Sequence, residues 1–290
     1  MKKLKFLPIL LGVLFVASMI SCTKEGVYNP KKKVQRIYYS VSSAWGSIDK
    51  YLGQTWNWDG NKIKSIDHYT SNGNTSYTEN FTYDGNRIVR VDDYKNAEYT
   101  TYDYDGSHLK TINYYYRNKV ESTMVFTYNS GKVSQIQVTY YDAKKGDRHL
   151  TSSIIPFFPE KVNKAMSAFA EKADVKGVVT ANYQFTWTDN NVTKIIASSE
   201  GEMTTMTFTY DAKKNPFFGF LCLEMGEDGI DSYYSKNNVT QYMESDINGE
   251  NYILNYTYQY DGNDFPTMCI ESELDDEDNY IYTTYYEYDK

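Results

Sequence analysis

The chain is poor in the residues on which most active sites depend. Its 290 residues include only three histidines, and His68, His108 and His149 show no His-Glu-x-x-His or other paired-ligand spacing. The sequence therefore predicts no zinc site and places each histidine on the surface of a strand or loop. It also lacks a Gly-x-Ser-x-Gly elbow, a Walker loop and a dinucleotide-binding fingerprint. We accordingly expect no catalytic residue, no metal, no cofactor and no enzymatic activity.

Positive charge is also in short supply. The chain has 30 lysines and arginines against 38 aspartates and glutamates, a formal net charge of -8. Because nucleic-acid binding needs clustered Lys and Arg side chains, this balance argues against nucleic acid as a partner. The basic run at residues 31–33 is interpreted as part of a solvated linker rather than a lipid-headgroup contact.

Cysteine is the third scarce residue, with three in the chain. Cys222 and Cys269 each lie in a short apolar stretch. An oxidising compartment permits them to form a disulfide, and each can equally act as a small buried hydrophobic side chain. The sequence leaves both alternatives open.

The one long apolar run lies at the N-terminus and predicts export. Lysines at positions 2, 3 and 5 precede an uncharged run over residues 6–20, and a small residue, Ser21, follows. This pattern is typical of a secretory signal peptide over residues 1–21, and the run is too short for a comfortable membrane span.

Residues 19–22, Met-Ile-Ser-Cys, resemble the lipobox of bacterial lipoproteins, with Met19 in place of the usual leucine. The resemblance implies that Cys22 becomes the acylated N-terminus, so that the protein is anchored to a membrane of the bacterial envelope, most naturally the outer membrane. Residues 22–33 are polar and contain Gly26 and Pro30, which is typical of a flexible lipidated tether. The face of the membrane stays open.

Aromatic residues are abundant, with 31 tyrosines, and they recur in a repeated unit. Residues 56–66, 81–91 and 102–112 each hold two aromatics one residue apart, an Asp-Gly turn, and aliphatic residues five and eight positions after the second aromatic. Alternation before the turn predicts a half-buried strand, and the turn predicts a hairpin. Because the aliphatic spacing of three departs from strict alternation, we expect a bulge in each returning strand.

The repeats predict a single all-β domain over residues 34–290. We expect sixteen to eighteen antiparallel strands in a long meander of hairpins, strongly curved or closed into a barrel-like shell. A transmembrane barrel is the main competitor, but charges such as Arg90, Asp92 and Lys110 leave no continuous lipid-compatible face. One insertion, at about 144–178, has helical spacing over residues 159–172 and predicts a short amphipathic helix that packs on the sheet or plugs an opening.

Two families resemble the chain at its turns. The Tyr-Asp-Gly-Asn turns resemble the tyrosine-aspartate repeats of Rhs-type proteins. The chain is also similar to a family of Bacteroidota lipoproteins of unknown function with a porin-like fold. The features that carry this resemblance are the lipobox, the tyrosine-rich hairpins, the segment 210–217 and the Tyr-Asp-Gly-Asn-x-Phe-Pro-Thr motif at 260–267. This resemblance implies a fold but no activity.

A lipid-anchored, non-enzymatic binding or scaffold module is therefore the leading hypothesis, with a glycan or an envelope protein as the partner. A glycan-binding accessory lipoprotein and an enzyme of unrecognised type are the alternatives. The acidic loop at 275–279 is interpreted as a solvated turn rather than a calcium site. The repeat tyrosines are expected to fill the core, and the candidates for a surface aromatic patch are Tyr114, Tyr115, Tyr116, Tyr140 and Tyr141.

Overall fold

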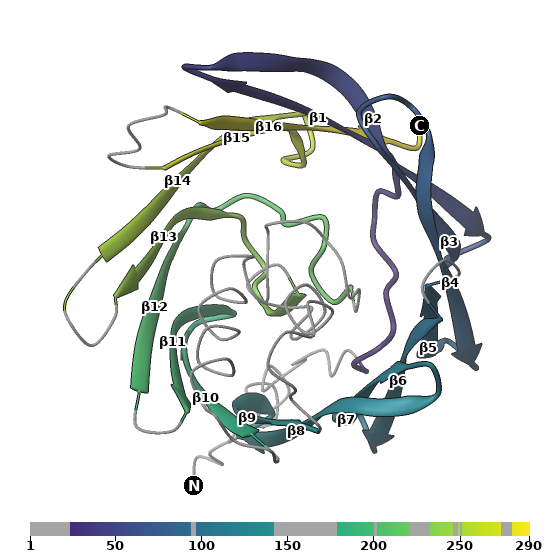
Figure 1. The fold of residues 1–290 in the computed structure, drawn as a ribbon, viewed down its shortest axis with the longest axis vertical. Helices are drawn as coiled ribbons and strands as arrows, with labels where there is room; N and C mark the ends of the chain where they lie inside the picture. The colour runs from purple at the N-terminus through teal and green to yellow at the C-terminus, as the bar shows by residue number, and fades with distance from the viewer. Residues whose placement is uncertain are drawn as a thin grey trace, which may run out of the picture.

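A computed structural model describes residues 24–93, 97–141, 179–199, 202–220, 233–245, 249, 251–273 and 280–290. The strands of these residues form one antiparallel sheet closed into a barrel (Figure 1), in which each strand pairs with the next along the chain and β16 pairs with β1. The all-β meander is confirmed, and the sheet closes. The helical insertion expected at 144–178 lies outside the described residues.

The barrel has 16 strands in the described part of the chain. Their bounds are β1 Val34–Ser43, β2 Gly46–Asp59, β3 Lys62–Tyr69, β4 Thr75–Asp84, β5 Arg87–Asp93, β6 Glu98–Asp105, β7 His108–Tyr116, β8 Lys119–Asn129, β9 Lys132–Tyr140, β10 Val179–Thr188, β11 Asn191–Ser199, β12 Glu202–Tyr210, β13 Val239–Ser245, β14 Asn251–Tyr260, β15 Pro266–Glu273 and β16 Ile281–Tyr288.

Each sequence repeat is a hairpin with a bulge beside its turn. Gly60, Gly85 and Gly106 have φ angles of 56°, 57° and 59°, which glycine adopts without the cost that a Cβ imposes. After the first turn, Trp58 pairs with Ile63 but Asn57 pairs with Ser65, so the returning strand has one residue more than its partner. The same shift recurs in the later hairpins of this kind, which confirms the expected bulge.

Apolar side chains face the inside of the barrel and polar ones face outward. In β8, Met124 and Phe126 are buried whereas Val125 and Thr127 are exposed. On the outer face Asp67 accepts hydrogen bonds from Asn57 (2.8 Å) and Thr78 (2.7 Å) across three strands. A transmembrane barrel has the reverse arrangement, with an apolar outer band.

In seven of the repeats, the second aromatic joins its strand to the preceding strand. Its hydroxyl or indole N–H donates to a backbone carbonyl at the start of that strand. We call these seven hydrogen bonds the rim staples. They are Trp58 to Val34 (2.8 Å), Tyr83 to Ile63 (2.9 Å), Tyr104 to Ile88 (2.6 Å), Tyr128 to Leu109 (2.8 Å), Trp187 to Val133 (2.7 Å), Tyr210 to Val192 (2.5 Å) and Tyr288 to Pro266 (2.8 Å).

The rim staples lie at one end of the barrel, which we call the turn end because it carries the turns after β2, β4 and β6. A barrel of 16 strands is too wide for its own side chains to fill. Here residues 24–33, 211–220 and 233–238 occupy the inside at the turn end (Figure 1), and we call these segments the plug.

Aromatic contacts join the plug to the wall, and one buried hydrogen bond joins two segments of the plug to each other. The ring centroid of Phe220 lies 4.8 Å from that of Tyr28 and 4.9 Å from that of Trp56. The Tyr28 hydroxyl also donates to the Pro216 carbonyl at 2.6 Å. The core therefore lies between the strands and the plug.

The interpretation of residues 22–33 as a flexible tether is wrong for residues 24–33. Tyr28 is buried among core aromatics, Lys32 forms an ion pair with Asp261, and Lys33 donates to the Gly60 carbonyl at 2.8 Å. The composition is that of a linker, but the unfilled interior of a wide barrel gives Tyr28 an apolar surface to bury against.

Removal of one rim staple tests its contribution to stability. We expect Tyr83→Phe to lower the free energy of unfolding by about 1 kcal/mol, because the Ile63 carbonyl loses its donor while the ring stays in place. Urea unfolding measures the change. Tyr115→Phe, on an outward-facing ring stacked on Tyr99, is the control and should stay near wild type. Equal stability of the two variants would contradict a stabilising role for the staple.

The same substitution has a consequence at high pH. Burial raises the pKa of Tyr83 to about 12 from its ordinary value of 10.0. Between those two values the unfolded chain loses this proton and the folded chain keeps it, so the contribution of Tyr83 to stability is complete below pH 10 and is lost as pH rises to 12. Tyr83→Phe should therefore lose stability less steeply over that range.

Candidate functional site

The predicted aromatic patch does not form one surface. Tyr114 and Tyr140 are 8% and 4% exposed and face the interior, so the prediction is wrong for these two. Successive side chains of a strand point to opposite faces, so runs of adjacent tyrosines are split between the inside and the outside. Tyr116 is half-buried at the end of β7, and Tyr141 is 36% exposed.

The outward member of the first run belongs to a stack on the wall. The ring of Tyr115 lies parallel to that of Tyr99, with centroids 4.4 Å apart, and the Arg90 guanidinium lies 3.7 Å from the Tyr99 centroid. Asp92 in turn accepts hydrogen bonds from Arg90. These side chains support one another across β5, β6 and β7.

Several other predicted features cannot be placed. The positions outside the described residues are Cys22, His149, Cys222 and the acidic loop 275–279. Cys269 is described and lies buried in β15. For Cys222 and Cys269, the disulfide and the two separate thiols thus both stay open alternatives.

Histidine placement differs from the surface positions expected. His68 is buried, its Nε2 lies 3.0 Å from Glu79 Oε2, and its ring stacks on Tyr77 at 4.1 Å. His108 lies against the Tyr128 ring, with centroids 4.4 Å apart. Within the described ranges, no group of three or more His, Cys, Asp or Glu side chains is arranged to hold a metal ion.

At the turn end, Glu25 fixes the start of the described chain to the barrel. Its Oε2 accepts hydrogen bonds from the Tyr128 hydroxyl at 2.6 Å and the Leu109 amide at 2.5 Å. Its own amide donates to the Ser107 carbonyl at 3.0 Å. Burial raises the pKa of Glu25, and the hydrogen bonds from Leu109 and Tyr128 oppose that rise.

The next residue, Gly26, requires the absence of a side chain. It has a φ of 78°, and a Cβ would lie 2.0 Å from the Tyr104 hydroxyl oxygen. Its carbonyl accepts a hydrogen bond from the Ile88 amide at 2.9 Å. Residues 25 and 26 are thus held by three neighbouring hairpins.

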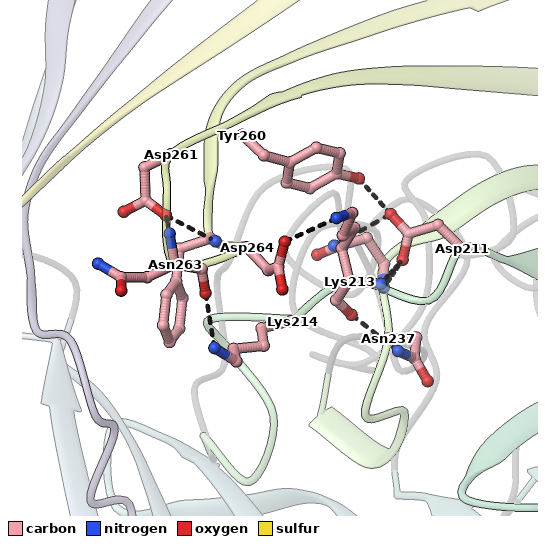
Figure 2. A network of polar contacts seen from close by, with 10 residues as sticks. Asp211, Lys213, Lys214, Asn237, Tyr260, Asp261, Asn263 and Asp264 are labelled. Atoms are coloured by element: carbon pink, nitrogen blue, oxygen red, sulfur yellow. Dashed lines mark hydrogen bonds and ion pairs between the residues drawn. The ribbon is translucent and has the colours of Figure 1, made fainter.

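A polar network joins the other plug segments to the turn between β14 and β15 (Figure 2). Asp211 accepts hydrogen bonds from the Lys213 amide at 2.8 Å, the Asn238 amide at 3.2 Å and the Tyr260 hydroxyl. By position Tyr260 corresponds to a rim staple, but it binds the Asp211 carboxylate. The long β12–β13 connection places that carboxylate within its reach.

The lysines of this network are paired with the facing turn. Lys213 Nζ lies 2.6 Å from Asp264 Oδ1, and Lys214 Nζ donates to the Asn263 carbonyl at 2.6 Å. The hydrogen bond from Lys213 lowers the pKa of Asp264. These bonds connect the plug to the β14–β15 turn, so the network holds the plug in place. In the sequence Asp211 follows a second aromatic just as the turn residue Asp84 does, and only the longer turn after Asp211 distinguishes it.

Exposed aromatics gather at the other end of the barrel, which we call the far end. Trp45 in the β1–β2 turn is 80% exposed, and Tyr280 and Tyr282 at the start of β16 are 37% and 36% exposed. The rings of Tyr280 and Tyr282 lie 6.2 Å apart and 16° from parallel. Val41 of β1 pairs with Tyr282 and with Ile48 of β2. We call Trp45, Ile48, Tyr280 and Tyr282 the aromatic lip.

The titration of Glu25 tests how the plug is held. Because its folded pKa is raised above 4.5, its contribution to stability is greatest below pH 4.5 and is lost as pH rises through the folded pKa. We expect Glu25→Gln to flatten this pH dependence between pH 4 and 7. Glu25→Ala should cost about 1 to 3 kcal/mol, because the Leu109 amide loses its acceptor. Urea unfolding across this pH range measures both, and a wild-type pH slope in Glu25→Gln would contradict the assignment.

Comparison with known proteins supports the fold. A porin-like protein from Bacteroides vulgatus has a TM-score of 0.51 at 10% identity and covers 89% of this chain and 99% of its own. A porin-like protein from Bacteroides uniformis has a TM-score of 0.50 at 11% identity and covers 88% of this chain and 96% of its own. TcdB2-TccC3 has a TM-score of 0.28 and bears no weight.

No family model matches the chain, and no curated protein matches it. Within the described residues no helix is long and apolar enough to cross a membrane. The chain is similar to the two porin-like proteins in fold, an antiparallel closed barrel.

Proposed function

We propose that the protein is an envelope lipoprotein, anchored through Cys22 to the bacterial outer membrane, whose barrel is a non-enzymatic binding or scaffold module. Two observations together carry this proposal. The wall has apolar side chains inside and polar side chains outside, the reverse of a transmembrane barrel, and the plug fills its turn end. Core aromatics face inward and pack on the plug, whereas polar side chains such as Asn57, Asp67 and Thr78 bond to one another on the outside. The polar outer face of such a barrel is compatible with contact with water, and the plug fills its turn end.

The anchor follows from the N-terminal sequence. A basic start, an apolar run and the Met-Ile-Ser-Cys segment precede Cys22. Each buried methylene of an acyl chain contributes about 0.8 kcal/mol, and more than one chain is needed for lasting attachment. A protein exported by this route needs no membrane-spanning segment of its own to stay at the envelope.

The roles of the carboxylates favour a non-enzymatic module. Asp59, Asp84 and Asp105 are used in the repeat turns, Asp211 holds the plug, and Glu25 accepts two hydrogen bonds. A hydrolase needs carboxyl groups that converge on a substrate. These carboxyl groups are instead bound to neighbouring parts of the barrel or placed in turns.

Substitution of Cys22 tests the proposed anchor. We expect the wild-type chain, expressed in a Bacteroides host, to incorporate labelled palmitate and to fractionate with the outer membrane. Cys22→Ala should lose the label and leave the membrane fraction, because no acyl chain can be attached. Cys269→Ala, at a buried strand position, is the control and should keep the label. Wild-type protein without label would overturn the proposal.

A glycan-binding accessory lipoprotein is the second candidate, and the aromatic lip favours it. Near-parallel exposed rings suit stacking on sugar rings, since aromatic side chains offer broad apolar faces with a polar edge. Tyr280 and Tyr282 supply such a pair, and Trp45 lies in the neighbouring hairpin turn.

A glycan array with residues 23–290 tests this candidate. We expect binding to at least one polysaccharide, and at least a tenfold loss of affinity in Trp45→Ala and Tyr282→Ala, because each substitution removes a stacking surface. Tyr115→Ala on the outer wall is the matched aromatic control and should bind as wild type. Absence of binding across the array, or equal loss in all three variants, would reject the glycan hypothesis.

A further inference from the structure

We infer that the turn end of the barrel faces the lipid bilayer and that the far end, with the aromatic lip, points away from it. This inference rests on the proposed attachment at Cys22. It concerns which part of the molecule the anchor holds against the membrane, and it follows from where residues 24–26 are fixed.

The start of the described chain is bound at the turn end. Glu25 bonds to Ser107 in the β6–β7 turn and to Leu109 just after it, and Gly26 bonds to Ile88 just after the β4–β5 turn. The contacts with Ser107 and Ile88 use the backbone on both sides, and the Leu109 amide donates to the Glu25 carboxylate. The lack of room for a Cβ at Gly26 also fixes the path of the chain next to Tyr104. Lys24 is exposed beside them.

Chain length then limits how far the anchor can lie from this end. Cys22 precedes Lys24 by two residues, and two extended residues span at most about 7 Å. A free tether of all twelve residues from 22 to 33 would have an r.m.s. length of about 20 Å. The bonds that Glu25, Gly26 and Lys33 make to the barrel remove that freedom.

The far end is beyond the reach of so short a connection. β4 has 10 residues and runs from one end of the barrel to the other, a length of about 33 Å. Acyl chains on Cys22 must enter the bilayer, so the turn end must lie close to the headgroups. The turn end carries paired charges of both signs, such as Lys32 with Asp261 and Lys213 with Asp264. The orientation is thus set by the short connection rather than by surface charge, and it should persist at high salt.

The two ends of β4 offer matched probes of the orientation. Asn86 lies exposed in the turn after β4 at the turn end, and Ser71 lies exposed in the loop before β4 at the far end. In a chain with Cys222 replaced by serine, single Asn86→Cys and Ser71→Cys variants of the acylated protein can be labelled with the same fluorophore at one site, because acylation blocks Cys22 and Cys269 is buried. Vesicles then carry a quencher on the lipid headgroup.

We expect at least threefold stronger quenching at Asn86→Cys than at Ser71→Cys, in low and high salt. A twelve-residue Gly-Ser linker inserted between Thr23 and Lys24 leaves the barrel intact and should bring the ratio close to one. Equal or reversed quenching in the acylated protein would overturn the orientation and leave the proposed anchor standing. Absence of palmitate label would overturn both.

Discussion

The barrel depends on the seven rim staples, the hydrogen bonds that its repeats make outside their own hairpins. The second aromatic of the repeat donates to a carbonyl at the start of the preceding strand, as Tyr83 does to Ile63. A bulge beside the turn leaves one residue without a ladder partner, and the aromatic donor supplies a partner near it. Because the donor and the acceptor belong to different repeats, a single hairpin cannot satisfy all the hydrogen-bonding groups of its own strands. Neighbouring hairpins must therefore pair, and the series ends where β16 meets β1.

Closure creates the second requirement, which is an interior to fill. The plug fills it at the turn end with Tyr28, Phe217 and Phe220, and the Asp211 network ties the plug to the barrel wall. The segment that begins two residues after the proposed anchor Cys22 thereby contributes Tyr28 to the core. Residues 24–33 are bonded to the wall at the turn end, and the proposed orientation of the barrel depends on these contacts and on the proposed attachment at Cys22.

Local sequence pattern was enough to predict the hairpins. Alternation before the turns, glycines such as Gly85, and the spacing of three between Ile88 and Val91 predicted strands, turns and bulges, and all three are present. The same local pattern does not predict interactions between segments that are far apart in the sequence. Tyr28 lies in a run that is polar by composition, and its burial depends on the width of a barrel built by residues far along the chain.

The predicted aromatic patch failed for a related reason. Tyr114 and Tyr140 are neighbours of outward-facing tyrosines, and which member of each run faces inward depends on the register set by the bulges. The sequence does not predict the aromatic lip, because Ile48 and Tyr282 are far apart in sequence and lie on either side of Val41 only after β16 has paired with β1.

Closure is the claim on which the staples, the plug and the orientation all depend, and the seam between β1 and β16 tests it most directly. Ser40 and Thr283 are directly paired across that seam. In a chain with Cys22 and Cys222 replaced by serine, Ser40→Cys with Thr283→Cys should form a disulfide under mild oxidation, seen as a mass loss of about 2 Da and a faster-migrating band, since opposed strand positions bring the two Cβ atoms to about 5 Å. Ser40→Cys with Thr101→Cys, on a distant strand, should stay reduced. If the Ser40 and Thr283 thiols stay as free as those of the control pair, the two strands do not meet and the sheet is open.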